Sequence, residues 1–145
     1  MTKERKLENI LYYLIEKTNK IVRRYSQIKF TQAGLDLTVD QWLVLKKVGE
    51  SSGLTQIEVA NALFKDRASI TRTLDLLLKK NLIRKEGGED KRTFQLSLTA
   101  QGKRFADQAL VIVNEVRRQG VAEMSEREQT QLKASLQKII ENLES

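Results

Sequence analysis

A run of basic and hydroxyl side chains near the middle of the chain has the chemistry needed to bind a polyanion. Lysine and arginine pair with phosphates, and arginine and short hydroxyl side chains also hydrogen-bond to the edges of bases. Lys65 and Arg67 are candidates for phosphate contacts, and Arg72 for contact with a base or a phosphate. Ser69 and Thr71 are candidates for short-range contacts. The alternative, an ordinary solvated helix face, stays open for this run taken alone.

A second candidate site follows a pair of glycines further along the chain, where Asp90, Lys91 and Arg92 stand in a row. A guanidinium group is favoured in the narrow minor groove of A·T-rich DNA, which is the role we expect for Arg92. Asp90 would hold Arg92 through a carboxylate–guanidinium pair. The alternative is a surface pair that contributes about 0–1 kcal/mol to stability and nothing to function. The combination of this tripeptide with the preceding basic run favours the nucleic-acid interpretation.

The amino-acid composition excludes several classes of chemistry. The chain has 145 residues and contains no His, Cys or Pro. Because histidine and cysteine supply most acid–base groups near neutral pH, thiolates and zinc ligands, the sequence excludes a Ser-His-Asp triad, a cysteine peroxide switch, a zinc finger and a disulfide. Carboxylate or lysine chemistry is not excluded. The sequence shows no Gly-rich phosphate loop or metal-spaced cluster, so we expect neither an enzyme nor a bound cofactor.

The net charge of +7 is unevenly distributed. Residues 1–30 carry +5 and residues 65–92 carry +4, whereas residues 31–64 carry −2 and residues 93–145 are neutral. A localised basic surplus favours a polyanion partner over general solubility. No run approaches the roughly 18 apolar residues of a membrane span, and no secretory signal is recognisable, so we expect a cytoplasmic protein.

Apolar periodicity and helix caps predict the elements that would position these side chains. The spacing from Leu7 to Ile28 predicts one long amphipathic helix without a break before Gly34. Alternating residues in 82–86 and 93–98 flank a Gly-containing tip, which predicts a β-hairpin. A hairpin directly after two short capped helices is a wing on a helix-turn-helix, so we expect a mainly α fold with a small β-hairpin wing. The caps that predict further helices are Thr38 with Gln41, Thr55 with Glu58, Asp66, Thr99, and Ser125 with Glu128.

Five short motifs occur in order along the chain: Leu37-Thr38 with Gln41-Trp42, Leu54-Thr55-Gln56 with Val59-Ala60, Thr71-Arg72 with Leu77, Asp90-Lys91-Arg92, and Leu98-Thr99-Ala100-Gln101-Gly102. Together they resemble the MarR family of multiple-antibiotic-resistance regulators, over nearly the whole chain. The resemblance implies a homodimeric winged helix-turn-helix repressor whose N- and C-terminal helices interlock two subunits. It also implies small, often aromatic or phenolic, ligands that lower the affinity for DNA.

The chain departs from the family pattern in its wing and in its sensing chemistry. Where the family frequently has a proline ahead of Asp-x-Arg, this chain has Gly87-Gly88-Glu89, which predicts a more mobile wing in the free protein. Family members that sense oxidants use cysteine and those that sense zinc use histidine. This chain has neither residue, so neither mechanism can operate in it.

The predicted elements form a single domain of residues 1–145. We expect residues 1–33 and 99–145 to form dimerisation helices and residues 38–98 to form the winged helix-turn-helix region. If two copies bury the apolar faces of these terminal helices, their recognition helices would lie about one DNA turn apart on a pseudopalindromic operator. An intrachain helical bundle is the alternative.

Three aromatic residues, Tyr12, Tyr13 and Trp42, are candidates for a ligand site. With arginines of the first helix they could line a cleft for an aromatic acid, as the resemblance implies. Aromatic residues at helical spacing belong more often to a hydrophobic core, and this alternative is favoured for each of the three.

These observations lead to one functional prediction with two alternatives. We expect a sequence-specific, double-stranded-DNA-binding transcriptional regulator, a repressor that a small ligand releases. The first alternative is a winged-helix or architectural DNA-binding factor that needs no ligand. The second is a helical adaptor that binds acidic proteins through its basic faces.

Overall fold

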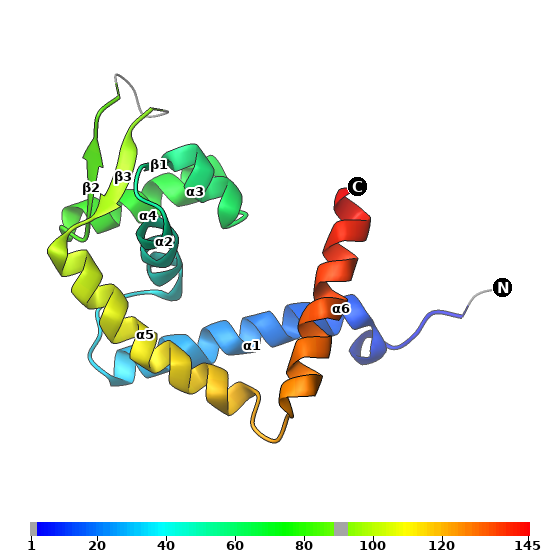
Figure 1. Ribbon diagram of the computed structural model, residues 1–145. Helices are drawn as coiled ribbons and strands as arrows, with labels where there is room; N and C mark the ends of the chain where they lie inside the picture. The colour runs from blue at the N-terminus through cyan, green and yellow to red at the C-terminus, as the bar shows by residue number, and fades with distance from the viewer. Residues whose placement is uncertain (1–2, 89–92) are drawn as a thin grey trace.

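The computed structural model describes residues 3–88 and 93–145 of the chain. The described part consists of six α-helices, a short 3-10 helix and a small antiparallel sheet (Figure 1). The mainly α fold with a β wing is therefore confirmed. In chain order the elements are η1 (Leu7–Asn9), α1 (Leu11–Gln32), α2 (Val39–Glu50), β1 (Leu54–Thr55), α3 (Gln56–Ala62), α4 (Arg67–Lys79), β2 (Ile83–Glu86), β3 (Gln95–Leu98), α5 (Ala100–Gly120) and α6 (Glu126–Glu144).

The first helix is shorter than its apolar pattern predicts. The predicted helix starts at Leu7, but residues Leu7–Asn9 form a 3-10 turn and Ile10 has an extended backbone (φ −88°, ψ 126°). No side chain caps the start of α1 at Ile10. Apolar periodicity shows which face of a helix is buried, but it does not show where the helix begins. Only a capping residue would have indicated the first residue of α1, and the sequence has none here.

The other helices begin at the residues that the caps predict. Thr38, Thr55 and Ser125 each complete a capping box, in which the hydroxyl accepts from the backbone N–H three residues on and the side chain there accepts in return. Asp66 and Thr99 cap α4 and α5 in the simpler one-sided way. These local bonds fix the starting points of the helices that carry the candidate site.

The sheet has three strands, in the order β1-β3-β2, instead of the two that the sequence predicts. The predicted hairpin is β2 paired with β3, with Ile83 opposite Leu98. The additional strand β1 has only two residues and pairs Leu54 with Leu96. A two-residue strand has no alternation from which it could be predicted, because a period of two needs a longer run to be recognised.

The hydrophobic core lies between α2, α3, α4 and the sheet, and α1 and α5 close it. Phe30, Leu45, Leu77 and Leu82 are all fully buried there. The segment between α4 and β2 fits tightly against the start of α5, since a Cβ at Gly102 would lie 1.9 Å from the carbonyl oxygen of Leu82. Only glycine allows this approach, and it sets the angle at which α5 leaves the winged part.

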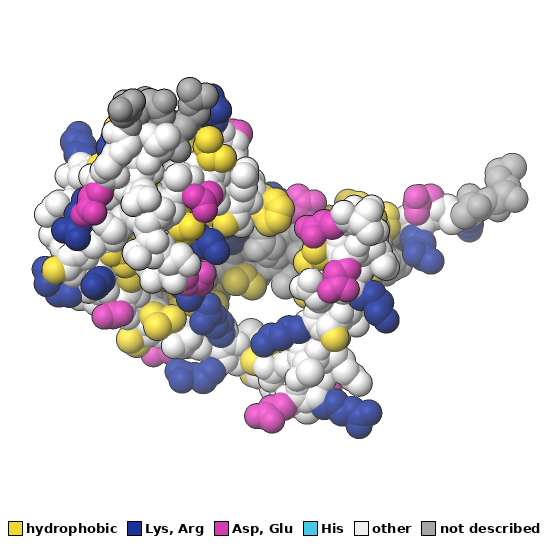
Figure 2. Space-filling view, turned by 45° about the horizontal axis from the view of Figure 1, so that its top comes forward, with side chains coloured by type: hydrophobic (Ala, Val, Ile, Leu, Met, Phe, Trp, Pro, Cys, Tyr) yellow, Lys and Arg dark blue, Asp and Glu magenta, His cyan; other side chains and the backbone are white. Residues whose placement is uncertain are grey.

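The terminal helices extend away from this core. In Figure 1, α5 crosses α1, and α6 then rises past the N-terminal end of α1 in this view, apart from the winged part. None of the α6 side chains, all of which the structure describes, is buried. Figure 2 shows hydrophobic side chains at the surface of this helical part, between lysine and arginine side chains. Within the described residues, no helix is long and apolar enough to cross a membrane.

Candidate DNA-binding surface

Helix α4 turns one face to the core and the other to solvent. Ile70, Leu74 and Leu77 are buried, as their i, i+4, i+7 spacing dictates. Arg72 lies on the opposite side and is exposed, and Arg67 is exposed in the first turn of the helix. A helix held in this way can present its polar face to a large partner without disturbing the core.

The N-terminus of α4 is fixed by Asp66. Its Oδ1 accepts a hydrogen bond of 2.7 Å from the backbone N–H of Ser69. This hydrogen bond lowers the pKa of the Asp66 carboxyl below its ordinary value of 3.8, with a smaller contribution from the charge of Arg72. The cap therefore holds the first turn of α4 while its carboxylate is ionised.

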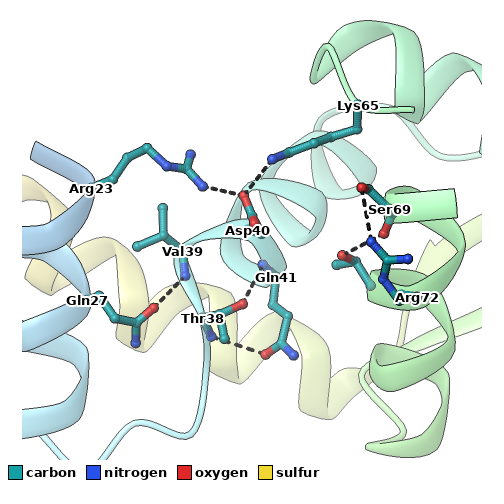
Figure 3. Close-up of polar contacts among 10 residues, drawn as sticks. Arg23, Gln27, Thr38, Val39, Asp40, Gln41, Lys65, Ser69 and Arg72 are labelled. Atoms are coloured by element: carbon teal, nitrogen blue, oxygen red, sulfur yellow. Dashed lines mark hydrogen bonds and ion pairs between the residues drawn. The ribbon is translucent and has the colours of Figure 1, made fainter. Parts of the chain in front are cut away.

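The structure brings Ser69 and Arg72 together and turns Thr71 elsewhere. Arg72 Nη2 donates to Ser69 Oγ at 3.3 Å across one turn of the helix (Figure 3). The hydroxyl oxygen of Thr71 accepts a 2.7 Å hydrogen bond from the Gln56 side chain of α3. Arg72 and Ser69 thus form one polar group on the exposed face, whereas Thr71 joins the two helices of the helix-turn-helix.

Lys65 and Arg67 lie where the turn after α3 enters α4. Both line a hollow of about 310 Å³ between the two helices, together with Thr71 and Gln56. Lys65 also forms an ion pair of 3.3 Å with Asp40 of α2. Phe64, which precedes it, has a left-handed backbone (φ 54°) and is 89% exposed. The turn therefore presents two cations and an aromatic ring beside the start of α4.

The predicted wing residues Asp90, Lys91 and Arg92 lie outside the described residues. The strands that lead to them are described, and both glycines before them adopt positive φ, 64° at Gly87 and 76° at Gly88. A Cβ at Gly88 would lie 2.6 Å from the backbone of Thr93, so this position requires glycine.

Three other basic residues near the wing have partners within the chain. Lys80 Nζ forms an ion pair of 3.4 Å with Asp36 and donates to the Gln41 side chain. Arg84 Nε pairs with Glu86 at 2.8 Å and donates to Ser97. The ammonium group of Lys85 lies 4.9 Å from the ring centre of Phe94. These contacts stabilise the winged part. Because the three cations already have partners within the chain, they attract an external anion less strongly than unpaired cations would.

Asp40 joins three elements at the edge of this surface. Its Oδ1 accepts from Arg23 Nη2 of α1 and is paired with Lys65 (Figure 3). Burial acts to raise the pKa of Asp40, but the hydrogen bond and charge of Arg23 and the charge of Lys65 outweigh it, so the pKa lies below 3.8. The sequence analysis missed Asp40, because its only signal was an acidic residue in the first turn of a helix, which is common.

A mainly apolar cavity of about 300 Å³ lies between α1, α2 and α5. Trp42 and Phe30 contribute to its wall, and two cationic residues, Arg23 and Arg117, also line it. Arg117 Cζ lies 6.0 Å from the ring centre of Trp42. An apolar wall with two cations suits a small aromatic anion.

The predicted ligand residues are not all found at this cavity. Trp42 lines it, but Tyr12 and Tyr13 lie about two helical turns before Asn19, the first residue of α1 that does. Tyr12 is 59% exposed. Arginines of the first helix were expected at such a cleft, and Arg23 of α1 does line this cavity. Arg117 could not be assigned to it from the sequence, because α5 reaches the cavity only by packing against α1 and α2.

A larger, open hollow of about 620 Å³ lies on the other side of Trp42, between α2, the sheet and α5. Its lining includes the cations Lys46, Arg84 and Lys103 but also the carboxylates Glu50 and Asp107. Lys46 is paired with Glu50 at 3.0 Å, and Arg84 with Glu86 at 2.8 Å. Because carboxylates share this lining or pair with its cations, the hollow is less suited to an anion than the smaller cavity.

Two short capped helices, a buried apolar face on the second, an exposed basic face and a following β-hairpin define a winged helix-turn-helix protein of the DNA-binding class. A profile of the MarR family matches residues 35–93, which span most of this region. The organic hydroperoxide resistance transcriptional regulator of Bacillus subtilis is 30% identical over 139 residues, covering 95% of this chain and 92% of that protein. The chain therefore belongs to the MarR family of transcriptional regulators.

Solved structures of the same fold include two complexes with DNA. The MepR–DNA complex from S. aureus has a TM-score of 0.80 and 26% sequence identity, covering 94% of this chain and 98% of that one. A cysteine-to-serine mutant of MarR from E. coli, complexed with operator DNA, has a TM-score of 0.79 and 25% identity, covering 89% and 92%. The resemblance that the five motifs suggested is thereby confirmed.

Proposed function

We propose that the protein acts as a homodimeric, sequence-specific regulator that binds double-stranded DNA through α4 and the wing. The observation that carries this proposal is the α4 surface, where the Ser69–Arg72 pair, Arg67 and Lys65 surround a capped helix start. A helix N-terminus with nearby cations suits phosphate, and an arginine on the exposed face suits a guanine edge. Two proteins of the same fold have been solved with DNA, which supports DNA as the partner.

The roles of single residues follow from their positions. Arg72 with Ser69 contacts a base edge or a phosphate from within the major groove, and Lys65 and Arg67 contact phosphates at the helix start. Thr71 contributes by bonding to Gln56, which fixes the spacing of α3 and α4. In the wing, Arg92 enters the minor groove, Asp90 orients it, and Lys91 adds charge near the backbone.

The dimer would be formed by residues 1–33 and 99–145, with residues 38–98 as the DNA-binding region. The supporting observation is the exposed apolar face that the terminal helices share, including Leu11 (54% exposed), Leu132 (50%) and Leu143 (74%). Faces of this size on neighbouring helices are rarely left in water. A twofold dimer would place the two α4 helices about 34–36 Å apart, one turn of DNA, and its operator would be a pseudopalindrome.

The cavity between α1, α2 and α5 is the proposed site for a small aromatic carboxylate that lowers the affinity for DNA. Arg23 and Arg117 would bind the carboxylate, and Trp42 the ring. Such a ligand can act only by binding the DNA-incompetent arrangement more tightly than the competent one. The Bacillus relative is named for organic hydroperoxide resistance, but this chain has no cysteine, so it cannot read an oxidant through a thiol.

The test is fluorescence anisotropy of the purified protein on DNA from upstream of its own gene and on scrambled DNA, at two salt concentrations. We expect tighter binding to the upstream DNA, saturating at one dimer per site, and weaker binding when an aromatic carboxylate is added. Equal binding to both DNAs that vanishes as the salt concentration rises would contradict sequence-specific regulation at this site. Specific binding without any ligand effect would favour the ligand-independent factor.

A further inference from the structure

One carboxylate oxygen links two surfaces that the proposed function treats separately. Asp40 Oδ1 accepts from Arg23 of α1 and lies 3.3 Å from Nζ of Lys65, in the turn before α4. Figure 3 shows both cations converging on Asp40 from opposite sides. The three side chains are 32%, 42% and 34% exposed for Arg23, Asp40 and Lys65, so water and small ions reach all of them.

The two cations that share Asp40 belong to different sites. Arg23 lines the cavity between α1, α2 and α5, where a ligand carboxylate would bind. Lys65 lines the hollow between α3 and α4 on the DNA side. A ligand carboxylate and a DNA phosphate would therefore each compete with Asp40, one for Arg23 and the other for Lys65.

We propose that Asp40 is a positioning residue that couples the ligand cavity to the DNA-binding surface. When Arg23 pairs with Asp40, the carboxylate charge is shared and Lys65 is held weakly enough to turn to a phosphate. When a ligand carboxylate takes Arg23, Asp40 is left to Lys65 alone, and the stronger pair holds Lys65 against α2. Because coupling between two sites is reciprocal, DNA that takes Lys65 strengthens the Asp40–Arg23 pair and weakens ligand binding.

This coupling rests on the proposed function, but it makes one prediction that the proposed function does not make. It requires the effect of Arg23 on DNA binding to pass through Asp40. A purely structural ion pair that joins α1 to α2 would make no such prediction. Partly exposed ion pairs of this kind contribute little to folding, so the variants that test the coupling should remain folded.

The experiment is a double-mutant cycle that needs no ligand. Arg23→Ala imitates the loss of Arg23 to a ligand and should weaken binding to upstream DNA about fivefold in the wild-type background. In an Asp40→Asn background the same change should have no further effect, because no carboxylate remains to hold Lys65. Asp40→Asn alone should tighten binding and steepen the dependence of log K on log salt concentration by about one unit, as Lys65 gains a phosphate.

Glu50 offers a matched control on the same helix. It also forms ion pairs with two lysines, Lys46 at 3.0 Å and Lys47 at 3.6 Å, but lies at the other end of α2. Glu50→Gln makes the same change in net charge as Asp40→Asn, and the effect of Arg23→Ala should survive in that background. Asp40→Glu, which keeps the carboxylate, should restore part of the coupling.

A ligand arm extends the test, with benzoate as the probe and neutral benzamide as its control. Benzoate should weaken DNA binding by the wild type and by Glu50→Gln, and should fail to do so in Asp40→Asn. Arg23→Ala acting equally in the wild-type and Asp40→Asn backgrounds would overturn the coupling and leave the proposed function standing. Failure of the wild type to prefer upstream over scrambled DNA would overturn the proposed function, and the coupling with it.

Discussion

The winged part and the two outermost helices of this chain, η1 and α6, place their apolar side chains in opposite ways. In the winged part, Leu45, Leu77 and Leu82 are completely buried. In η1 and α6, Leu7 is 58% exposed and Leu143 is 74% exposed. The winged part buries its apolar side chains within a single chain. The apolar face of η1 and α6 stays exposed unless another molecule, such as a second subunit, packs against it. The stability of the first should be independent of protein concentration, and that of the second should not.

The same substitution in the two regions should have very different effects. Leu77→Ala removes a fully buried side chain and should lower the free energy of unfolding by about 2–5 kcal/mol. Leu143→Ala removes a side chain that one chain leaves in water, so any loss should come from the dimer. Urea unfolding at two protein concentrations measures both. The comparison fails if Leu143→Ala is equally destabilising at both concentrations.

A charge on the exposed face of α6 should separate the subunits and leave the winged part folded. Ile140, 46% exposed in the single chain, would lie between subunits, where an unpaired glutamate is costly to bury. We expect Ile140→Glu to produce monomers in sedimentation velocity. Its affinity for upstream DNA should fall at least about tenfold, because two half-sites no longer bind as one unit.

The control for this experiment is Ala134→Glu, which adds the same charge on the opposite side of α6. This variant should remain a dimer and keep its affinity for DNA. If both variants dissociate, the apolar face of α6 is not the interface. If neither does, the exposed face in α6 has another partner.

The sequence could predict those features that depend on neighbours in the chain. Thr38 with Gln41 and Ser125 with Glu128 are capping boxes that span three residues, and the structure has both where the sequence places them. Asn81, after the end of α4, has a left-handed backbone (φ 60°), which asparagine tolerates at a helix C-terminus. Local bonds are encoded locally, so the start of each capped helix could be predicted from the sequence.

Contacts between distant segments could not be predicted in this way. The sequence shows Arg23 as one of the arginines of a long first helix, but only the packing of α1 against α2 brings it to Asp40, 17 residues away. Tyr12 and Trp42 were grouped by residue type, whereas the packing of α2 against α5 places Trp42 beside Arg117 instead. The family resemblance supplied the fold that makes such crossings, but not the side chains that meet there.

Within the winged part, the start of α4 should depend on the ionisation of Asp66. Its pKa is lowered in the folded protein by the hydrogen bond from Ser69. The cap therefore stabilises the fold above the unfolded pKa, near 3.8, and this contribution is lost as the pH falls through the folded value. Asp66→Ala should lower Tm by about 3 °C at pH 7 and by less at pH 3.

Asp66→Asn separates the cap from its charge. Asparagine caps helices about as well as aspartate, so this variant should keep most of the Tm at pH 7. The part of the acid sensitivity that belongs to this position should disappear. An unchanged pH profile in Asp66→Asn would show that other carboxylates account for the loss of stability in acid.

The smallest effect on stability is expected from a substitution in the turn before α4. Substitutions at exposed positions usually leave the free energy of unfolding unchanged, but this one should raise it. Phe64 has a left-handed backbone (φ 54°), which a bulky side chain adopts at a cost, and it is 89% exposed, so its ring returns little by burial. Phe64→Gly should therefore raise the free energy of unfolding by about 0.5–1 kcal/mol, after the added flexibility of the unfolded chain is subtracted.

Asn81→Gly at φ 60° is the matched control, and should change the free energy of unfolding less because asparagine tolerates this backbone. Equal gains at the two positions would mean that the aromatic side chain adds no strain of its own. A loss at Phe64 would mean that the ring contributes to folding through contacts that its exposure conceals.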